Sequence, residues 1–587
     1  MQISQIDGNN NKICEFMKVA LLFGHANKAE FVRALCNAVL IKVGLRYLDI
    51  VVADKVNISI LLCVLFCVIS VFGEPRVDPL VLISSQGLVR GHRATDGDYS
   101  MFLGVPYAQV DPENPFGPSQ ARQPFQEIIF DAQDGTIRCP QMGSSNTESE
   151  TIDCLRLNIF VPFIASTYSP LPVLVWIHGG DFVRGSAADY GVRNLVRHDV
   201  VVVTVNYRLG PYGFMCLDNP SVPGNQGLKD QYAALAWIRK NIASFGGNPY
   251  NVTIAGQDAG AASVLLHLYA DNTKLFHKAI VESGTPQSEG MFVNADVDAA
   301  IMIAQHLGVN ATDTDEALQF LISAPHDLVT AAAHELNLQL RPCKERSFSG
   351  LENFVENDPY SLTNRIKVRN TPVLIGYTSN ERAALSNEYF DSDPFYEKLR
   401  NNFNLNGLQL EQAATFVRRF YIGYDPVSED VATDLENFES DFVFGHPSKR
   451  IVSRLFEENV GSVYNYVFSY GGSSGAQGAG HSAELNYLFD IGVTLKRSED
   501  DQLITDRITT LWTNFIKYGN PTPQTSDLIP VRWTPVTASN RPTLVIDTDI
   551  RMDTRVENQR MAFWDLFYSM YGTYSNLARE CVFTKCC

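Results

Sequence analysis

The chain has 587 residues, of which 45% are apolar and 19% charged, a composition typical of a globular protein with a sizeable core. Its formal net charge of −18 disfavours a nucleic-acid partner, which would require a basic surface stripe, and also disfavours adhesion to anionic membranes. The charge is compatible with a soluble extracellular protein and equally with a protein that attracts cationic ligands.

An uncharged apolar run over residues 58–72 is followed by the small residue Gly73. This pattern predicts a secretory signal peptide cleaved after Gly73, and the run is short for a membrane span, which needs about 20 residues. Residues 1–57 precede the run and are unusually long for a secretory signal. A type II membrane anchor through 58–73 and a wrong start site are therefore the alternatives. A buried core helix is disfavoured because the run has no polar face.

The cysteines that follow this run are odd in number, so an extracellular chain would keep one thiol free or bonded to another chain. Cys139 and Cys154 flank a polar stretch that is typical of a surface loop, and we predict a disulfide between them. The pattern leaves open how the others pair, namely Cys216, Cys343, Cys581, Cys586 and Cys587. Asn310 is the better of two glycosylation sequences, because Asn251 adjoins a predicted core strand.

From residue 77 onward, apolar runs of strand length alternate with stretches of helical periodicity. In chain order we predict strand 173–177, strand 200–206, helix 228–242, strand 251–255 and helix 261–269. This succession predicts an α/β fold with a large, mostly parallel sheet covered by helices on both faces. We expect three parts: an N-terminal extension with the signal or anchor segment (1–73), one α/β domain (77–575) and a cysteine-containing tail (576–587).

A tight glycine turn over residues 256–260 (GQDAG) joins the last predicted strand to the last predicted helix. Glycines at both ends let a strand turn sharply into a helix, so that the central side chain projects from the top of the sheet. In the nucleophile elbow of α/β-hydrolases the pattern is Gly-x-Ser-x-Gly. Here Asp258 is the central residue. The turn alone is a weak signal, and its neighbours make it specific.

Ordered motifs along the chain accompany this turn, and with them the chain resembles the type-B carboxylesterase and cholinesterase family over roughly 77–571. The sequence around the turn is most similar to insect carboxylesterases and juvenile hormone esterases. The resemblance implies an α/β-hydrolase fold without metal or cofactor. The matching motifs are FLGVPYA (102–108), DCLRLN (153–158), WIHGG (176–180), NYRLG (206–210), PGNQGLKDQ (223–231), GH (480–481) and WTNFIKYGNP (512–521).

The resemblance assigns the three catalytic positions of the family. Asp258 stands at the nucleophile position, where the family has serine, Glu381 at the acid position and His481 at the base position. This is the nucleophile–acid–base order of the fold. Arg382 replaces the glycine that usually follows the acid. His446 is a rival for the base, but its sequence is typical of an ordinary loop or helix entry.

The resemblance also places an oxyanion hole, built from the backbone N–H groups of Gly180, Asp181 and Ala259. Asp181 stands where the family usually has glycine or alanine. Its negative charge would oppose stabilisation of an oxyanion, unless it is a harmless exposed turn residue. Asp181 would therefore be a second substitution, besides Asp258, that weakens the catalytic site.

Asp258 changes the chemistry of the predicted site. A serine esterase needs a hydroxyl that histidine can deprotonate, whereas a carboxylate is already ionised near pH 7. Its attack on an ester would give a mixed anhydride, from which the carboxylate leaves more easily than the alkoxide. Ser263 cannot substitute, because it lies inside the following helix. An ion pair of Asp258 with His481 should raise the pKa of the imidazole.

We therefore predict a catalytically inactive, secreted, carboxylesterase-like protein that acts by ligand binding or protein interaction. One alternative is a carboxylic ester hydrolase with residual activity. Another is an Asp-nucleophile hydrolase of the epoxide-hydrolase type, in which the carboxylate attacks an sp³ carbon. The expected partners are a small apolar or ester-like ligand and an extracellular protein. A choline ligand is disfavoured, because the 139–154 loop has no tryptophan to stack on the cation.

Overall fold

The computed structural model describes residues 79–143, 147–472, 478–491, 497–537 and 540–576. The predicted signal or anchor segment (1–73) lies outside the described residues, as does the C-terminal tail beyond Asn576 with its cysteines. In the described part of the chain, no helix is long and apolar enough to cross a membrane.

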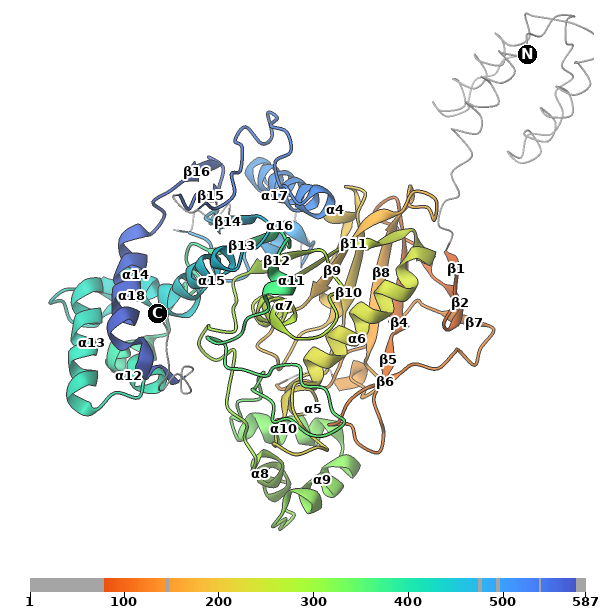
Figure 1. Ribbon diagram of the computed structural model, residues 1–587, viewed down its shortest axis with the longest axis horizontal. Coiled ribbons are helices and arrows are strands. Elements are labelled where there is room, and N and C mark those ends of the chain that lie inside the picture. The colour runs from red at the N-terminus through yellow and green to blue at the C-terminus, as the bar shows by residue number, and fades with distance from the viewer. Residues whose placement is uncertain (1–78, 144–146, 473–477, 492–496, 538–539, 577–587) are drawn as a thin grey trace, which may run out of the picture. The chain divides into compact units, whose positions relative to one another are not determined.

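A mixed sheet of 11 strands forms the centre of the domain (Figure 1). Seven adjacent strands of this sheet run parallel to one another, and antiparallel strands complete both edges. The parallel strands are β15, β14, β13, β12, β11, β9 and β10. In spatial order the strands are β16 (Arg551–Asp553), β15 (Thr543–Ile546), β14 (Val463–Phe468), β13 (Val373–Thr378), β12 (Lys278–Glu282), β11 (Gly247–Gln257), β9 (Leu171–Ile177), β10 (Val201–Val205), β8 (Arg156–Pro162), β4 (Tyr99–Pro106) and β3 (His92–Arg93).

Two small sheets lie outside the central one. They consist of β1 (Leu80–Ile83), β2 (Gly87–Arg90) and β7 (Ile129–Asp131), and of β5 (Ala108–Gln109) and β6 (Gln120–Ala121).

Helices lie between most of the successive strands of the central sheet, singly or in runs. The helices are α4 (Arg193–Val196), α5 (Gly210–Phe214), α6 (Gln226–Asn241), α7 (Ala259–Tyr269), α8 (Ala299–His306), α9 (Thr314–Ser323), α10 (His326–Glu335), α11 (Arg365–Val368), α12 (Pro394–Asn402), α13 (Gly407–Tyr421), α14 (Ala432–Ser440), α15 (His446–Glu457), α16 (Leu485–Leu488), α17 (Glu499–Tyr518) and α18 (Asn558–Tyr571). Figure 1 shows α12, α13, α14 and α18 packed together, and their aromatic side chains form a core of their own.

Successive side chains of the central strands enter two different cores. In β9, Val175 and Ile177 join the core that contains α6 and α7, whereas Leu174 and Trp176 join the core that contains α17. Side chains alternate between the two faces of a strand, so a strand that is apolar throughout needs helices on both sides. The continuous valine and isoleucine runs in the sequence therefore explain why the sheet is buried on both faces.

The predicted α/β architecture is confirmed, with differences in element bounds. The five predicted elements correspond to β9, β10, α6, β11 and α7. β11 starts at Gly247, earlier than predicted, because Gly247 already pairs with Leu171. A short 3₁₀ turn (Ile242–Phe245) ends the helical stretch, and Gly246 follows it with a φ of 76°, a left-handed conformation that suits glycine.

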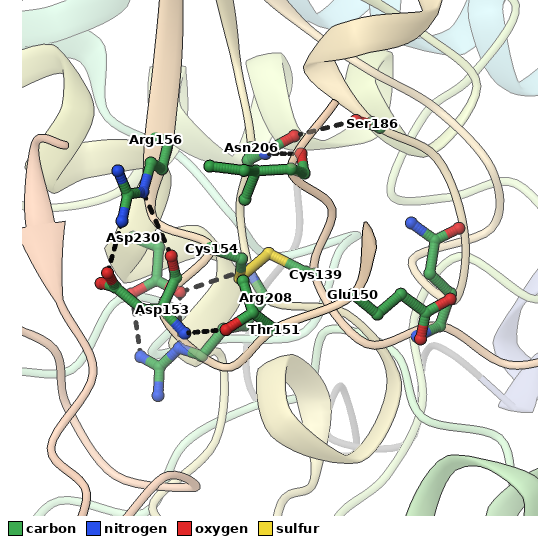
Figure 2. The surroundings of a disulfide bond; sticks show 12 residues. Cys139, Glu150, Thr151, Asp153, Cys154, Arg156, Ser186, Asn206, Arg208 and Asp230 are labelled. Carbon is green, nitrogen blue, oxygen red and sulfur yellow. Dashed lines mark hydrogen bonds and ion pairs between the residues drawn. A yellow bond between two sulfur atoms is a disulfide. The ribbon is translucent and has the colours of Figure 1, made fainter. Parts of the chain in front are cut away.

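Two disulfides join buried cysteines. The predicted bridge between Cys139 and Cys154 is confirmed, and Figure 2 shows it beside Asp153 and Arg156, which form an ion pair at 2.5 Å. The second bridge joins Cys216 to Cys343, two cysteines whose partners the sequence left open. Its two cysteines are 127 positions apart, so it ties together distant segments of the domain.

Candidate functional site

The glycine turn between β11 and α7 forms the sharp elbow that its pattern predicts. Asp258 stands at the apex with φ 58° and ψ −121°, a conformation that non-glycine residues rarely adopt. A Cβ atom on Gly260 would lie 2.0 Å from the carbonyl oxygen of Ile177, and one on Gly256 would lie 2.7 Å from the same oxygen. Glycine is therefore required at both positions, because β9 passes too close for any side chain.

The structure brings Asp258, Glu381 and His481 together. His481 Nδ1 donates to Glu381 Oε2 at 2.5 Å, and the other oxygen of Glu381 accepts the N–H of Thr378 at 2.8 Å. His481 Nε2 lies 3.9 Å from Asp258 Oδ1. Glu381 follows β13 and its side chain is fully buried. Its hydrogen bond to Nδ1 therefore fixes the orientation of the imidazole. The phenyl ring of Phe444 lies 4.9 Å from the imidazole, centre to centre.

The predicted oxyanion-hole donors point at the side chain of Asp258. The backbone N–H groups of Gly180 and Asp181 both donate to Asp258 Oδ2, at 2.9 Å and 3.0 Å. Ala259, the third predicted donor, is the first residue of α7 and lies directly after the apex. The carboxylate oxygen thus occupies the point on which the two N–H groups of the hole converge.

The loop that carries these donors has an uncommon backbone. Gly180, Asp181 and Phe182 have φ angles of 100°, 60° and 60°, so two residues with side chains adopt a left-handed conformation in succession. Such residues cost on the order of 1 kcal/mol or more each. The loop is held by the fully buried ring of Phe182 and by a hydrogen bond from Gly210 N–H to the carbonyl of Phe182 at 2.8 Å.

Asp181 has a cationic partner that the sequence reasoning missed. Its carboxylate lies 3.6 Å from Arg341, whose side chain is only 10% exposed. Burial lowers the pKa of Arg341, and the charges of Asp181 and Asp258 act in the opposite direction. The charge of Asp181 is thus compensated, and its side chain is 53% exposed, which weakens the predicted conflict with an oxyanion.

His481 is a cation at neutral pH. Burial alone would lower the pKa of His481, but the charge of Glu381, the hydrogen bond to Glu381 and the charge of Asp258 outweigh it and raise the pKa to about 9. The amide nitrogen of Gln257 lies 2.9 Å from Nε2. A protonated Nε2 needs an acceptor, and a half-turn of the amide, which exchanges its nitrogen and oxygen, supplies one.

Two further buried carboxyl groups belong to this region, and the sequence reasoning did not single them out. Glu282 ends β12 and accepts the indole N–H of Trp512 at 2.7 Å, while Glu484 lies three residues after His481. Burial and the charge of Glu484 raise the pKa of Glu282 well above its usual range. Burial and the charge of Glu381 raise the pKa of Glu484 to about 8. In both groups the shift favours the protonated form.

A cavity of about 250 Å³ opens above Asp258 and His481. Half of the lining residues have ionisable side chains. A cavity that faces many charged groups suits a polar ligand better than a purely apolar one. The lining residues with ionisable side chains are Asp181, Arg184, Asp258, Glu289, Arg382 and His481.

Other residues weighed from the sequence lie outside the cavity lining. His446 is buried in α15, where it contacts Asp565 at 3.1 Å and stacks on Tyr568. Ser263 is buried inside α7 and donates to the carbonyl of Ala259 at 2.9 Å. Neither can therefore replace the predicted base or nucleophile.

Comparisons with known proteins relate the chain to ester hydrolases. Residues 77–564 match the carboxylesterase family. The chain is 30% identical over 554 residues to juvenile hormone esterase of Heliothis virescens, which covers 86% of this chain and 97% of that protein. It is also 30% identical over 477 residues to esterase FE4 of Myzus persicae, covering 74% and 82% of the two chains. Bile salt-activated lipase of Rattus norvegicus is 30% identical over 512 residues, covering 81% and 82%. The family match and the 11-stranded sheet confirm the predicted α/β-hydrolase fold.

Proposed function

The chain belongs to the carboxylesterase family, and we propose that it is a secreted, non-hydrolytic member that acts by binding a small ligand or an extracellular protein. In this proposal Asp258 stands at the nucleophile position, with Glu381 and His481 as the acid and base positions. The inherited site keeps its architecture and has lost the group that would attack an ester.

The hydrogen bonding of Asp258 carries the proposal. An oxyanion hole accelerates ester hydrolysis because its N–H groups are free to receive the charge that develops on the substrate oxygen. Here Gly180 and Asp181 already donate to Asp258 Oδ2, at 2.9 Å and 3.0 Å. Hydrogen bonds to an ionised acceptor are stronger than those to a neutral one. An ester carbonyl, which is neutral before attack, would therefore have to displace a better acceptor.

The charge of His481 supports the same conclusion. A general base must be neutral in order to take up a proton, and catalysis is best when the pKa lies near the working pH. With its pKa raised to about 9, His481 is protonated at neutral pH. The ion pair with Asp258 and Glu381 thus stabilises the charged form of the residue that an esterase would use as a base.

Secretion is supported by the two disulfides of the domain. Bridges such as Cys139–Cys154 and Cys216–Cys343 form and persist in oxidising compartments. We propose cleavage after Gly73 and glycosylation at the exposed Asn310. N-terminal sequencing of the secreted protein should begin at Glu74; a chain retained in the membrane with residues 58–73 intact would show an anchor instead.

A second candidate function follows from the intact pair of His481 and Glu381. With Asp258 as nucleophile on an sp³ carbon, this pair would activate water to hydrolyse the resulting alkyl ester, as in epoxide hydrolases. Asp258 Oδ2 is held by two N–H groups, which leaves Oδ1 facing His481 at 3.9 Å. Incubation with styrene oxide followed by mass spectrometry of the 256–260 peptide should give no adduct; a trapped ester on Asp258 would establish this second function.

A fluorophosphonate probe tests the proposal directly, because it labels activated serines. The purified wild-type protein should remain unlabelled, whereas the Asp258→Ser variant should be labelled if His481 regains the role of base. The Asp258→Ser/His481→Ala double variant is the matched control and should again resist labelling. Stoichiometric labelling of the wild-type protein would show that another serine acts as nucleophile, and the proposal would be abandoned.

A further inference from the structure

The carboxylates that line the cavity already have donors. Glu289 accepts from Lys398 at 2.7 Å and from Asn402 at 2.6 Å. Asp258 accepts two backbone N–H groups, and Asp181 faces Arg341. A ligand that offers hydrogen-bond donors or a positive charge would therefore have to compete with existing protein partners at each of these acids.

Two arginines of the lining are in the opposite situation. The guanidinium groups of Arg184 and Arg382 have no carboxylate partner and no hydrogen-bond acceptor within the described ranges of the chain. The guanidinium carbon of Arg382 lies 5.5 Å from the ring centre of Phe444. Each guanidinium presents five N–H donors in a planar fork. Arg184 and Arg382 thus present donors and positive charge to the cavity.

The geometry points to a binding site for a small organic carboxylate, held by Arg184 and Arg382; this inference rests on the proposed function of the cavity as a ligand site. A guanidinium fork matches the two oxygens of a carboxylate, and such charge-assisted pairs are strong. The oxyanion hole cannot receive the ligand carboxylate because Asp258 already fills it. The ligand charge is therefore expected at the arginines and not beside the elbow.

Three apolar side chains also line the cavity and indicate what the rest of the ligand is. Met291, Val443 and Phe444 offer an apolar surface within the same cavity. Val443 and Phe444 come from a π-helical turn (Asp441–Gly445), a kind of distortion that often occurs at functional sites. A short alkyl chain attached to the carboxylate can pack on this surface. An inorganic anion has no such group, so an alkyl carboxylate should bind more tightly than phosphate.

Calorimetric titration at pH 7 with hexanoate, hexan-1-ol and inorganic phosphate tests the inference. Hexanoate should bind about 10-fold more tightly than either of the other two probes, because only hexanoate combines the charge with the chain. Arg184→Gln and Arg382→Gln should each weaken hexanoate binding by about 10-fold and leave hexan-1-ol unchanged. Arg551→Gln removes an exposed arginine of β16 outside the cavity lining and should have no effect.

Equal affinity for hexanoate and hexan-1-ol would overturn the inference, as would hexanoate binding that survives both arginine substitutions or no binding of hexanoate at all. Tighter binding of phosphate would show a site for inorganic anions instead. Arg382→Lys keeps the charge without the fork and should retain part of the affinity, which separates loss of a contact from misfolding. Hydrolysis of p-nitrophenyl hexanoate by the wild-type protein would end the proposed non-hydrolytic function without affecting the carboxylate site.

Discussion

Gly180 and Asp181 direct two N–H groups at one point, and the side chain of Asp258 is long enough to reach it. A serine at the same apex has a single oxygen and a shorter side chain, so it would leave this point for the substrate. Aspartate adds a second oxygen and a full charge. Under the proposed assignment, the exchange therefore affects two parts of the site at once, because it removes the nucleophile and fills the oxyanion hole.

The raised pKa of His481 is expected to depend on its acidic neighbours in a defined order. Glu381 contributes both charge and a hydrogen bond at 2.5 Å, whereas Asp258 contributes charge from 3.9 Å. Glu381→Gln should therefore lower the pKa of His481 more than Asp258→Asn does. NMR titration of the His481 ring protons measures both shifts, with His446, which is buried elsewhere, as an internal reference. An equal or larger effect of Asp258→Asn would contradict this order.

The same shift predicts how stability changes with pH. The folded-state pKa of His481, about 9, exceeds its ordinary value of 6.5, so protonation of this residue favours the folded state. This contribution is fully present below pH 6.5 and is lost as the pH rises through 9, and it is on the order of 2 kcal/mol after allowance for partial exposure. Urea unfolding of the wild-type protein and His481→Gln should differ most at pH 6 and converge by pH 10. A difference that stays constant over this range would contradict the assignment.

At the residue scale, the sequence identified positions better than interactions. The motifs predicted that Asp258, Glu381 and His481 would meet, because each follows a recognisable strand or loop. They could not predict that Asp258 would turn its carboxylate into the hole, since this depends on the side-chain torsion angles. Arg341 was missed because its contact with Asp181 joins residues that lie far apart in the sequence.

At the scale of elements, the elbow depends on the close approach of β9 to the start of α7. Alanine within a helix is ordinarily about 1 kcal/mol more favourable than glycine. At Gly260, however, the added Cβ would lie 2.0 Å from the carbonyl oxygen of Ile177, so either the strand or the helix must move. The local helix propensity is therefore overruled by packing between elements.

We expect Gly260→Ala to lower the free energy of unfolding by several kcal/mol, as overpacking within a core does. Gly407, the first residue of α13, is the matched control, because a Cβ there meets no atom within 4 Å and its φ is not left-handed. Gly407→Ala should be neutral or slightly stabilising. Urea unfolding measures both variants. A Gly260→Ala variant as stable as Gly407→Ala would show that the elbow is less tightly packed than described.

Element types and order were predictable wherever the pattern was long and continuous, as in β9, β10, α6 and α7. Boundaries were harder. The glycines and proline at 246–249 are typical of a loop, but β11 begins at Gly247 because its backbone pairs with Leu171 in the neighbouring strand. When pairing with a neighbouring strand determines where a strand begins, the residues at that boundary do not indicate it by themselves.

At the scale of the whole molecule, the two disulfides should contribute unequally. In the chain-entropy account, a bridge stabilises more when it closes a longer loop, about 3 kcal/mol for 15 residues and nearly 5 kcal/mol for 100. The separations here are 15 for Cys139–Cys154 and 127 for Cys216–Cys343. Replacing the second pair by alanines should therefore destabilise the protein more than replacing the first, as measured by guanidinium unfolding. The reverse order would show that local packing outweighs loop length.

Hydrolysis of an aryl ester by the wild-type protein and by Asp258→Ser is the most direct test of the central claim. Opening the oxyanion hole and restoring a hydroxyl at one apex should turn an inactive protein into an esterase, provided that Glu381 and His481 are still competent. We expect no turnover of p-nitrophenyl acetate by the wild-type protein. Asp258→Ser should raise kcat/KM about 100-fold or more above background, an increase lost again in Asp258→Ser/His481→Ala. Turnover by the wild-type protein that depends on His481, or no gain in a folded Asp258→Ser variant, would contradict the account.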